Sequence, residues 1–493
     1  MTKKYLILSM LVTFLSACSG DNSSSNPGLP AEPAGIAITN VTVIDAVNGV
    51  REMQTVIFEG DEITAVQSAD ISISVVESID GTGKFLIPGL WDFHIHLTST
   101  DLLENSMMKL LLSYGVTSVR DTGADLDLLK PMVETAREEG TPGPRIFYAG
   151  PLLDGEYIVY DGSSLFRPPL GSANTIADMA SATVANLKAE GVDFIKIYEM
   201  VSPEVFEALV DAANEEGLPI AAHVPLSTLA SQSGPQVDSM EHLRNVLLDC
   251  TSNPMELLDS RLALLENPDG LSGSELRSSI HADQRTLALA NYDDARCEST
   301  IAALSSTLQV PTLSLNSGIL KPYFRDDWQD ALNRLPEPAR SLITGFGASR
   351  AAADDGTEIP NDDDTITFAE RQLMLVKRMY DMGVPIAAGT DAPVPITIPG
   401  HNLHLELAAL VHAGLSPLDA IGAATLRPAE FFSMEDEMGT IDVGKRSDMV
   451  LLDSDPLLDI ENTRTISTVI TKGIVLRSED IELLIQESAN PSI

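Results

Sequence analysis

The sequence predicts an α/β protein in which a (β/α)8 TIM-type barrel carries a small β-sandwich domain built from both ends of the chain. Three observations predict this fold. Short β-rich runs alternate with helical stretches through the middle of the chain, as a parallel α/β fold requires. Runs that alternate apolar and polar residues stand near both ends, over residues 36–79 and 439–475. The 493 residues are enough for a barrel of about 250 residues and an accessory module.

The β-sandwich is expected from two separated segments, residues 36–86 and 435–480. In the first segment, the turn at Glu59-Gly60-Asp61 separates two alternating runs, which indicates a hairpin. The second segment shows the same alternation of apolar and polar residues. Because strands stand at both ends of the chain, with mixed helices and strands between them, we expect the two segments to fold together. Residues 481–493 are left as a C-terminal tail.

Eight β-rich runs supply the strands of the barrel, which is expected over residues 87–434. These runs cover residues 90–96, 116–121, 145–149, 194–198, 220–223, 239–242, 310–315 and 384–390. In a barrel of this kind the active site lies at the carboxyl ends of the strands. Two polar, mostly helical stretches, about 251–296 and 321–364, fit this repeat poorly. We interpret them as insertions on the catalytic face and as candidate lids.

The charge balance excludes one class of partner. The chain has 72 acidic and 31 basic residues, and its formal net charge is −41. A field of this sign repels phosphate backbones, so we expect no nucleic-acid binding. A solvated acidic surface accounts for the excess without an acid-specific partner. A small-molecule substrate is the partner that we expect, and a homo-oligomer is compatible with the sequence.

The N-terminus predicts export. Lys3 and Lys4 precede an apolar stretch over residues 5–14, which is too short for a transmembrane helix of about 20 residues. Leu15-Ser16-Ala17-Cys18 resembles a bacterial lipoprotein signal, in which the cysteine is acylated. We therefore expect a signal peptide over residues 1–17, a lipid anchor at Cys18 and a flexible tether over 18–35. The predicted location is the cell envelope, on the outer membrane, with the lipid anchor as the sole membrane contact. An ordinary secretory signal is the alternative.

Two further cysteines, Cys250 and Cys297, lie in a region without strong core periodicity. In an oxidising compartment such a pair forms a disulfide. The alternative is two buried thiols.

A His-x-His motif ends the first predicted barrel strand. Alternate residues of a strand point to the same face, so His94 and His96 present two imidazoles side by side. Two such groups suit the chelation of one divalent ion. By itself the motif is weak evidence, because core and surface histidines produce it by chance.

Later strands end in further groups with metal chemistry. His223, His242 and Asp391 each end a predicted strand, and Lys196 lies inside one. A buried ammonium without compensation is costly, so Lys196 needs an ion partner or a special role. Any one of these residues has an ordinary structural explanation. Their joint occurrence, in order and at successive strands, predicts a metal site at the carboxyl ends of the barrel strands.

Several motifs resemble the amidohydrolase superfamily, and most closely its imidazolonepropionase-like and prolidase-like branch. The resemblance spans residues 36–475. It is carried by the segments 86–96, 114–121, 191–198, 222–225, 241–242, 389–393, 404–407 and 439–448. Together they are specific for the superfamily and much less specific for a substrate.

The resemblance implies a binuclear hydrolase. His94, His96 and Asp391 would hold one metal, and His223 and His242 a second, with zinc as the expected ion. Lys196, carboxylated by CO₂, would bridge the two and so lose its unfavourable buried positive charge. A bridging hydroxide would be the nucleophile. Asp391 would pass its proton to the leaving nitrogen.

Other polar residues near these strands are candidates for substrate contacts or for structural support. Tyr198 shares a strand face with Lys196 and is a candidate to bind the substrate carbonyl or carboxylate. His401 and His404 are candidate substrate contacts, and the alternative for His404 is a hydrogen bond at a helix start. We expect Arg120 and Asp121 to form a supporting ion pair. Glu241 is expected to be structural, and His281 and His412 are expected to be ordinary solvated or helix-face histidines.

The resemblance favours hydrolysis of an amide or peptide-like C–N bond, of the Xaa-Pro dipeptide or N-acyl amino acid type. Mononuclear deaminases of the superfamily keep a glutamate near the third histidine, but His223 is followed by Val224-Pro225-Leu226. Hydrolysis of a phosphotriester or lactone on the same metals is the enzymatic alternative. A non-catalytic binding lipoprotein is the other alternative, although all six ligand positions are filled.

Overall fold

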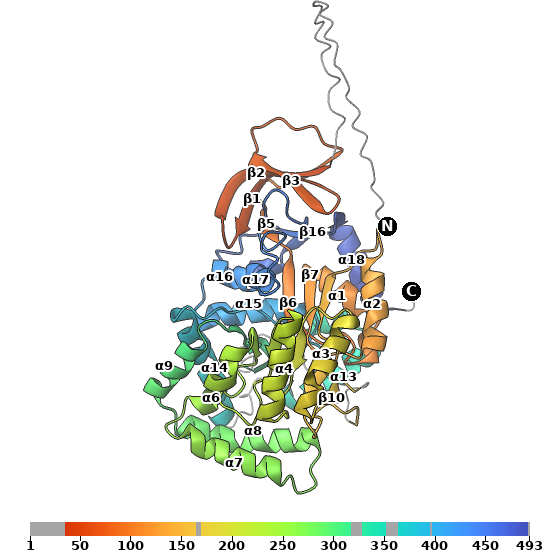
Figure 1. Ribbon diagram of the computed structural model, residues 1–493. Helices are drawn as coiled ribbons and strands as arrows, with labels where there is room; N and C mark the ends of the chain where they lie inside the picture. The colour runs from red at the N-terminus through yellow and green to blue at the C-terminus, as the bar shows by residue number, and fades with distance from the viewer. Residues whose placement is uncertain (1–34, 164–168, 317–327, 352–362, 395–396, 492–493) are drawn as a thin grey trace, which may run out of the picture.

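The computed structural model describes residues 35–163, 169–316, 328–351, 363–394 and 397–491. The predicted signal peptide, Cys18 and nearly all of the predicted tether lie outside these ranges. Figure 1 shows two regions, a small sheet at one end and a larger body of parallel strands and helices. Among the described residues, every helix is too short or too polar to cross a membrane.

Segments from both ends of the chain build one mixed sheet of eight strands. The path runs β17-β16-β15-β5-β1-β2-β3, and β4 pairs with β1. The strands are β1 (Ile36–Asp45), β2 (Gly49–Glu59), β3 (Glu62–Ser68), β4 (Glu77–Asp80), β5 (Phe85–Pro88), β15 (Met449–Leu452), β16 (Ile466–Thr471) and β17 (Ile474–Arg477). The antiparallel pairing of β15 with β5 joins the two segments. The strands form one continuous sheet, so a two-sheet sandwich stays a prediction.

Nine short parallel strands form the larger body. One sheet has the order β6-β7-β8, and the other β10-β9-β11-β12-β13-β14. The strands are β6 (Leu90–Ile95), β7 (Val116–Asp121), β8 (Arg145–Tyr148), β9 (Leu152–Asp154), β10 (Gly171–Ala173), β11 (Ile195–Ile197), β12 (Ile220–Ala222), β13 (Ser239–Glu241) and β14 (Leu308–Val310). All residues of these strands are buried except in β8 and β10, as parallel strands covered by helices require.

Two predicted strands differ from the structure. The run over 310–315 was wrong: β14 ends at Val310, Pro311 follows, and Leu313–Asn316 form α10. Proline has no N–H for the ladder, which explains the stop. The run over 384–390 forms single bridges instead of a ladder. Pro385 O accepts from Gln309 N at 2.9 Å and Ala388 O accepts from Phe93 N at 3.0 Å, so this segment lies between β14 and β6. The three-residue strands β9 and β10 were not predicted.

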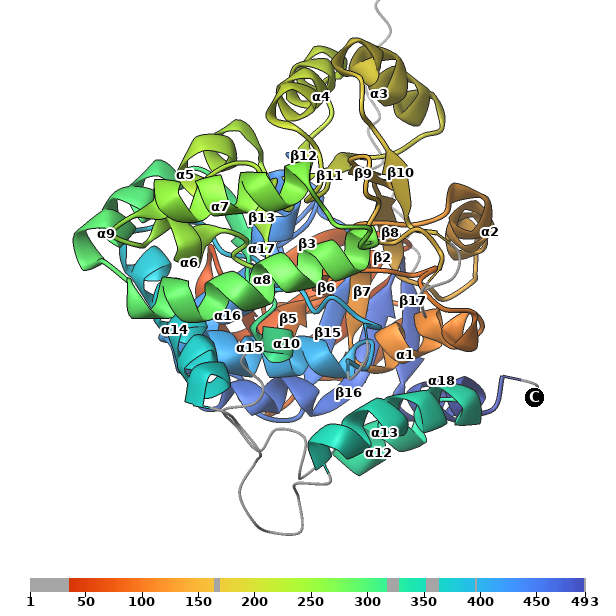
Figure 2. The same ribbon diagram turned by 90° about the horizontal axis from the view of Figure 1, so that it is seen from below.

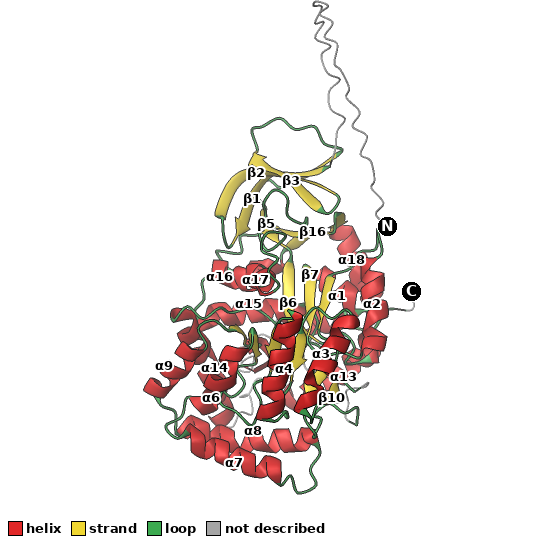
Figure 3. Cartoon of the chain, viewed as in Figure 1, coloured by secondary structure: helices red, strands yellow, loops and turns green. Residues whose placement is uncertain are grey.

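Helices surround the parallel strands, as Figure 3 shows in red. The longer ones are α2 (Leu126–Arg137), α3 (Ala180–Ala189), α4 (Pro203–Glu216), α7 (Pro254–Glu266), α8 (Gly273–Ala290), α9 (Asp294–Ala303), α13 (Glu337–Ala351), α14 (Asp363–Asp381), α15 (His401–Ala413) and α18 (Ser478–Ala489). The shorter ones are α1 (Met107–Ser113), α5 (Ala230–Ser233), α6 (Val246–Asp249), α12 (Trp328–Asn333), α16 (Pro417–Ala423) and α17 (Leu426–Phe431). Much of the predicted C-terminal tail is therefore helical, and α18 packs on α1.

The predicted insertion over 251–296 forms α7 and α8. Figure 1 places them at the end remote from the small sheet, and Figure 2 shows them crossing in front of the parallel strands. A disulfide joins Cys250, before α7, to Cys297 in α9. This bond closes the segment that contains both helices, and so ties the insertion to the body at its two ends.

Candidate metal centre

The carboxyl end of β6 supplies the first two imidazoles. Every residue of β6 is buried, and the backbone alternates so that His94 and His96 reach the same side. Their ring centroids lie 5.4 Å apart. Both side chains are nearly inaccessible, with 1% exposure for His94 and 8% for His96.

Asp391 approaches these imidazoles from the segment that lies between β14 and β6. Its amide donates to His94 O at 2.8 Å, and its φ of +62° turns the chain sharply at this point. Asp391 Oδ1 lies 3.1 Å from His96 Nε2 and 3.4 Å from His94 Nε2. The other carboxylate oxygen, Oδ2, lies 3.8 Å from His242 Nε2. The carboxylate therefore faces three of the predicted ligands.

His223 and His242 follow β12 and β13 and complete the cluster. The His242 ring lies 4.6 Å from that of His223 and 4.5 Å from that of His94, between centroids. Two sets of three ligand atoms lie within 4.8 Å of one another: those of His94, His223 and His242, and those of His94, His96 and Asp391. The strand ends thus bring together five of the six predicted ligands in two overlapping sets.

Each of the four histidines uses Nδ1 for a contact outside the cluster. The partners are Glu241 Oε2 for His94 at 2.5 Å, Gly123 O for His96 at 3.0 Å, Glu199 Oε1 for His223 at 2.8 Å and Thr312 Oγ1 for His242 at 2.6 Å. A histidine that binds a metal typically donates its other N–H in this way, which fixes the ring orientation and tautomer. The arrangement leaves all four Nε2 atoms for the centre.

Lys196, the sixth predicted ligand, lies in β11 and is fully buried. Its Nζ has no hydrogen-bond partner and lies 3.7 Å from Glu241 Oε1. Burial lowers the pKa of Lys196 to about 7. The negative charge of Glu241 raises this pKa, but its effect is smaller than that of burial. An amine at this pKa is substantially neutral near pH 7, so it can react as a nucleophile.

The residues fit divalent metal ions. His94 Nε2 and Lys196 Nζ are buried polar atoms without a hydrogen-bond partner, and such atoms are rare unless an ion or another group satisfies them. Imidazole nitrogen and carboxylate oxygen are ligands that suit zinc and related ions. Burial lowers the pKa values of His223 and His242 well below the usual range, which keeps both rings neutral and able to ligate.

Glu241 and Arg120 form a buried ion pair behind His94, whose Nδ1 contacts Glu241. Arg120 Nη2 donates to Glu241 Oε1 at 2.7 Å, and both side chains are 0% exposed. The predicted pair of Arg120 with Asp121 is wrong, because consecutive strand residues point to opposite faces. Asp121 instead accepts from the amides of Leu97 and Gly123.

Glu199 is a functional residue that the sequence analysis missed. Besides His223, its carboxylate contacts Arg244 at 3.3 Å, Arg277 at 3.1 Å and His281 at 2.7 Å. His281 was expected to be an ordinary solvated or helix-face histidine; it does lie in the helix α8, but its ring contacts a buried carboxylate. Arg277 and His281 belong to α8, so a single buried carboxylate connects the insertion to a predicted metal ligand. The chain position of Glu199, next to Tyr198 at the end of a strand, is the one local signal for it.

The remaining predicted site residues lie in different places. Tyr198 packs against the His223 ring, next to the cluster, with ring centroids 4.3 Å apart and the two rings tilted by 33°. His404 lies elsewhere, with Nδ1 2.9 Å from Thr463 Oγ1 and Nε2 3.0 Å from Tyr114 O. Both of its ring nitrogens are used in structural contacts, which matches the hydrogen-bonded alternative and leaves neither for a substrate. His401 is buried against the Tyr114 ring.

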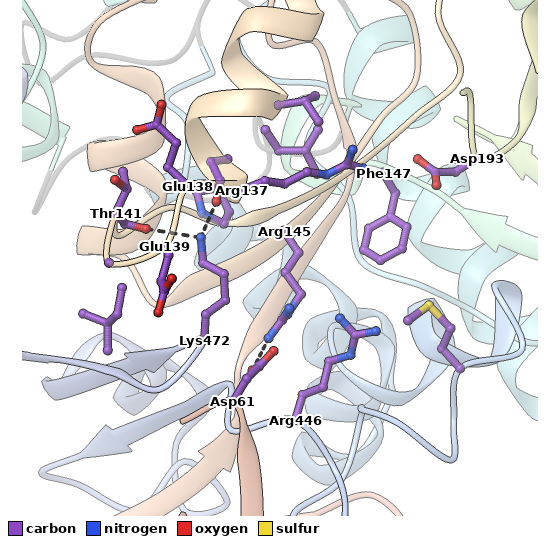
Figure 4. Close-up of a pocket in the computed structure, with 17 residues that line it drawn as sticks. Asp61, Arg137, Glu138, Glu139, Thr141, Arg145, Phe147, Asp193, Arg446 and Lys472 are labelled. Carbon is purple, nitrogen blue, oxygen red and sulfur yellow. Dashed lines mark hydrogen bonds and ion pairs between the residues drawn. The ribbon is translucent and has the colours of Figure 1, made fainter. Parts of the chain in front are cut away.

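A separate cleft lies at the other end of β8, where the small sheet meets the body. It has a volume of about 500 Å³, and Figure 4 shows Arg145 and Asp61 in it pointing toward each other. Arg145 pairs with Asp61 and with Asp448, and Lys472 donates to backbone carbonyls, including that of Thr141. The cleft contains none of the predicted metal ligands, and these contacts identify it as a junction between the two regions.

Comparison with known proteins identifies a family for the chain. The model of the Amidohydrolase family matches residues 85–245 and 346–476. Among curated proteins, an imidazolonepropionase of Brevibacillus brevis is 23% identical over 231 residues, which are 43% of this chain and 53% of that protein. The chain spans between 15% and 53% of the length of the curated relatives it matches.

Solved structures show the same fold over nearly the whole chain. A Xaa-Pro dipeptidase with bound methionine in the active site is 18% identical, with a TM-score of 0.63 and coverage of 90% of this chain and 100% of that one. A bottromycin amidohydrolase is 21% identical, with a TM-score of 0.68 and coverage of 94% and 92%. At these identities the likeness establishes an amidohydrolase-type fold.

Proposed function

The chain belongs to the amidohydrolase family, and on this premise we propose that it hydrolyses an amide or peptide-like C–N bond of a small molecule. The proposed substrates are Xaa-Pro dipeptides or N-acyl amino acids. One observation carries the proposal: four buried histidines leave Nε2 for one centre, three of them beside the Asp391 carboxylate. The similar structures that include a Xaa-Pro dipeptidase and a bottromycin amidohydrolase support this choice of bond.

The proposed cofactors are two divalent ions, with zinc as the native metal. His94, His96 and Asp391 would hold one ion, and His223 and His242 the other. Bound divalent ions supply Lewis acidity, which polarises a carbonyl and lowers the pKa of water.

The chain's own residues carry the proton and orient the substrate. Hydrolysis adds water across the bond, so the acyl carbon gains a hydroxyl and the nitrogen leaves with a proton. Asp391 accepts a proton from the attacking water and gives it to the leaving nitrogen. Burial raises the pKa of Asp391, but His242, His94 and His96 outweigh this and hold it well below the usual range. The carboxylate is therefore ionised and ready to accept.

Tyr198 is proposed to donate a hydrogen bond to the substrate carbonyl. Burial raises the pKa of Tyr198 well above its usual value, so the hydroxyl keeps its proton. Its position on the His223 ring supports a place beside the scissile bond. Tyr198→Phe should lower kcat with little effect on metal content.

Lys196 is proposed to be carboxylated. The neutral amine attacks CO₂, a C–N bond forms, and the lost proton leaves an N-carboxylate with an anionic oxygen pair. The buried, unpartnered Nζ supports this change, because carboxylation converts an amine without a hydrogen-bond partner into a group whose oxygens can bind metal ions. In the metal-free protein, ¹³C-bicarbonate should give a carbamate NMR signal that Lys196→Gln lacks.

Metal analysis joined to a substrate screen tests the proposed function. Chelator-treated protein is reloaded with zinc and assayed against dipeptides, N-acyl amino acids, lactones and phosphotriesters. We expect about two zinc ions per chain, hydrolysis of amides and loss of activity on chelation. Hydrolysis confined to lactones or phosphotriesters would support the alternative reaction on the same metals. A protein that binds no metal and hydrolyses none of these compounds would support a non-catalytic binding lipoprotein.

We also propose that the parallel strands close into a barrel. The segment that contains Pro385 and Ala388 hydrogen-bonds to β14 on one side and to β6 on the other, and so occupies the position of a closing strand. The terminal sheet is proposed to fold as a β-sandwich beside it.

Export to the cell envelope as a lipoprotein anchored at Cys18 is proposed from the N-terminal sequence. The Cys250–Cys297 disulfide supports an oxidising compartment. Labelling of cells with a palmitate analogue should mark the wild-type protein in the outer-membrane fraction. Cys18→Ser should abolish the label, and a labelled Cys18→Ser protein would contradict the anchor.

A further inference from the structure

We infer that Asn245 is a positioning residue for the candidate metal centre. Its buried side-chain amide joins the loop after His223 to the loop after His242, and so fixes the distance between the two ligands of the proposed second ion. Arg261, from α7 of the insertion, holds this amide in place. The inference rests on the proposed binuclear centre, and it goes further by assigning the spacing of one ligand pair to a residue that is not itself a ligand.

The loops that follow β12 and β13 carry this ligand pair. His223 comes directly after β12 and His242 directly after β13, and the centroids of their rings lie 4.6 Å apart. The pairing of the two strands fixes the backbone up to this point. Beyond it, the spacing of the two imidazoles depends on how the loops are held against each other.

The loop after β13 has a backbone conformation that must be enforced. The φ values of His242, Leu243 and Asn245 are +58°, +54° and +63°. This left-handed region is unfavourable for residues with a side chain, although asparagine tolerates it better than most. Such a conformation persists only where the surrounding structure holds it. The contacts of the Asn245 side chain are therefore part of what keeps His242 at its place in the centre.

The amide of Asn245 makes contacts that span the two loops. Its Nδ2 donates to Pro225 O at 2.8 Å and to Val224 O at 3.2 Å, with a longer contact to Thr228 O at 3.4 Å. Val224 and Pro225 are the two residues that directly follow His223. Asn245 is buried, so water does not compete for these hydrogen bonds. A side chain from one ligand loop therefore binds the backbone of the other.

Arg261 determines which end of the amide faces the carbonyls. Its Nη1 donates to Asn245 Oδ1 at 2.6 Å, and its Nε donates to Gln284 Oε1 at 2.6 Å. A guanidinium only donates hydrogen bonds and a backbone carbonyl only accepts them, so the amide oxygen must face Arg261 and the amide nitrogen the carbonyls. These three side chains line a cavity of about 80 Å³ beside His242.

The insertion thereby takes part in spacing the ligands. Arg261 belongs to α7 and Gln284 to α8, the two helices that cross in front of the parallel strands in Figure 2. A metal site needs its ligands within roughly 0.5 Å of the productive geometry. His94 and His96 come from the end of one strand, whose backbone sets their spacing. Loss of the Asn245 amide should therefore weaken the second ion and spare the first.

Two substitutions of Asn245 test the inference. Asn245→Asp keeps the size of the side chain and the bond from Arg261, but it turns an acceptor toward the carbonyls of the other loop. Asn245→Gly keeps the left-handed backbone and removes the side chain. Zinc binding to the full chain is measured by competition with a chromogenic chelator. We expect each variant to bind one ion like wild type and the other about 10- to 100-fold more weakly, the usual effect of removing a support of a metal ligand.

Two further variants complete the test. Asn462→Asp removes an amide bond to Asp455 O of 2.8 Å in the short helix Ile460–Arg464. It is the matched control and should leave both zinc affinities unchanged. Arg261→Met removes the donor that orients the amide, so it should weaken the same ion by a smaller factor. Unchanged zinc affinities in Arg261→Met would overturn the role of α7.

The zinc measurement separates this inference from the proposed reaction, because no substrate is present. Selective weakening of one ion in both Asn245 variants supports the inference even when no amide is hydrolysed. Unchanged affinities, or equal weakening of both ions, would overturn the inference while amide hydrolysis stands. A wild-type protein that binds a single ion would contradict the binuclear centre. In that case the affinity of this ion must fall in both variants, and an unchanged affinity would overturn the inference.

Discussion

Glu199 Oε1 lies 2.8 Å from Nδ1 of His223. This carboxylate is 0% exposed. It also contacts Arg277 and His281 of α8. The orientation of one predicted metal ligand is therefore connected to the position of an insertion that covers the carboxyl ends of the strands.

Glu199→Gln should weaken metal binding. The amide keeps the shape of the side chain but loses the negative charge that accepts the Nδ1–H of the neutral His223 ring. Loss of such a support typically costs roughly 10- to 100-fold in metal affinity. Zinc affinity is measured by competition with a chromogenic chelator. Glu207→Gln, an exposed glutamate of α4, is the control. A zinc affinity equal to that of wild type would contradict the role.

Arg120→Met should destabilise the fold by about 3–5 kcal/mol, because it leaves the buried Glu241 carboxylate without its closest cation. Urea unfolding of the metal-free protein measures the loss. Arg120→Met combined with Glu241→Met removes both charges, so it should be less damaging than the sum of the single changes. Additive losses would show that the two side chains are not coupled.

Glu406→Gln should stabilise the protein at alkaline pH. Burial raises the pKa of Glu406 to about 8 from 4.5, against a smaller effect of its bond from Ser314 N. Between these values the folded state keeps a proton that the unfolded state releases, so wild-type stability falls as pH rises. At ~pH 9 the variant should exceed wild type by on the order of 4 kcal/mol, and this advantage should vanish at ~pH 4. Urea unfolding at both pH values measures the free energy of unfolding of the variant and of wild type. If the difference between the two proteins is the same at both pH values, the raised pKa of Glu406 is contradicted.

Reduction of the Cys250–Cys297 disulfide should destabilise the protein. The bond closes a loop with a sequence separation of 47 residues, for which chain entropy predicts a loss of about 4 kcal/mol. Thermal unfolding with and without a thiol reductant measures it. The Cys250→Ser/Cys297→Ser variant should have the same Tm as reduced wild type, and this Tm should not change when the reductant is added. An identical Tm for oxidised and reduced wild type would contradict the stabilising role.

Much of the candidate centre was predictable because its signals are local. An apolar run that ends in a polar residue marks the end of a buried strand, and this pattern placed His94, His96, His223 and His242 at the strand ends. The same reasoning failed for residues 310–315, where Pro311 stops β14 and a short helix begins. It also missed β9 and β10, because three-residue strands are too short to show a period.

The supporting contacts were not predictable in this way. Arg120 was expected to pair with its chain neighbour, yet it reaches Glu241, which is 121 residues away. His281 was expected to be solvated, yet it binds Glu199 across 82 residues. Such pairs depend on which strands and helices become neighbours, and a single sequence does not record that.

The sequence by itself determined the types of the predicted ligands, their order along the chain and their places at strand ends, and the last of these follows from local periodicity. The tertiary structure alone decided which carboxylate contacts Nδ1 of His94 and which contacts Nδ1 of His223. It also decided that arginines of α8 and its neighbours line a cavity beside His242. The physical reason is that strand alternation is set within a few residues, whereas the meeting of distant charges depends on the register and packing of the whole fold.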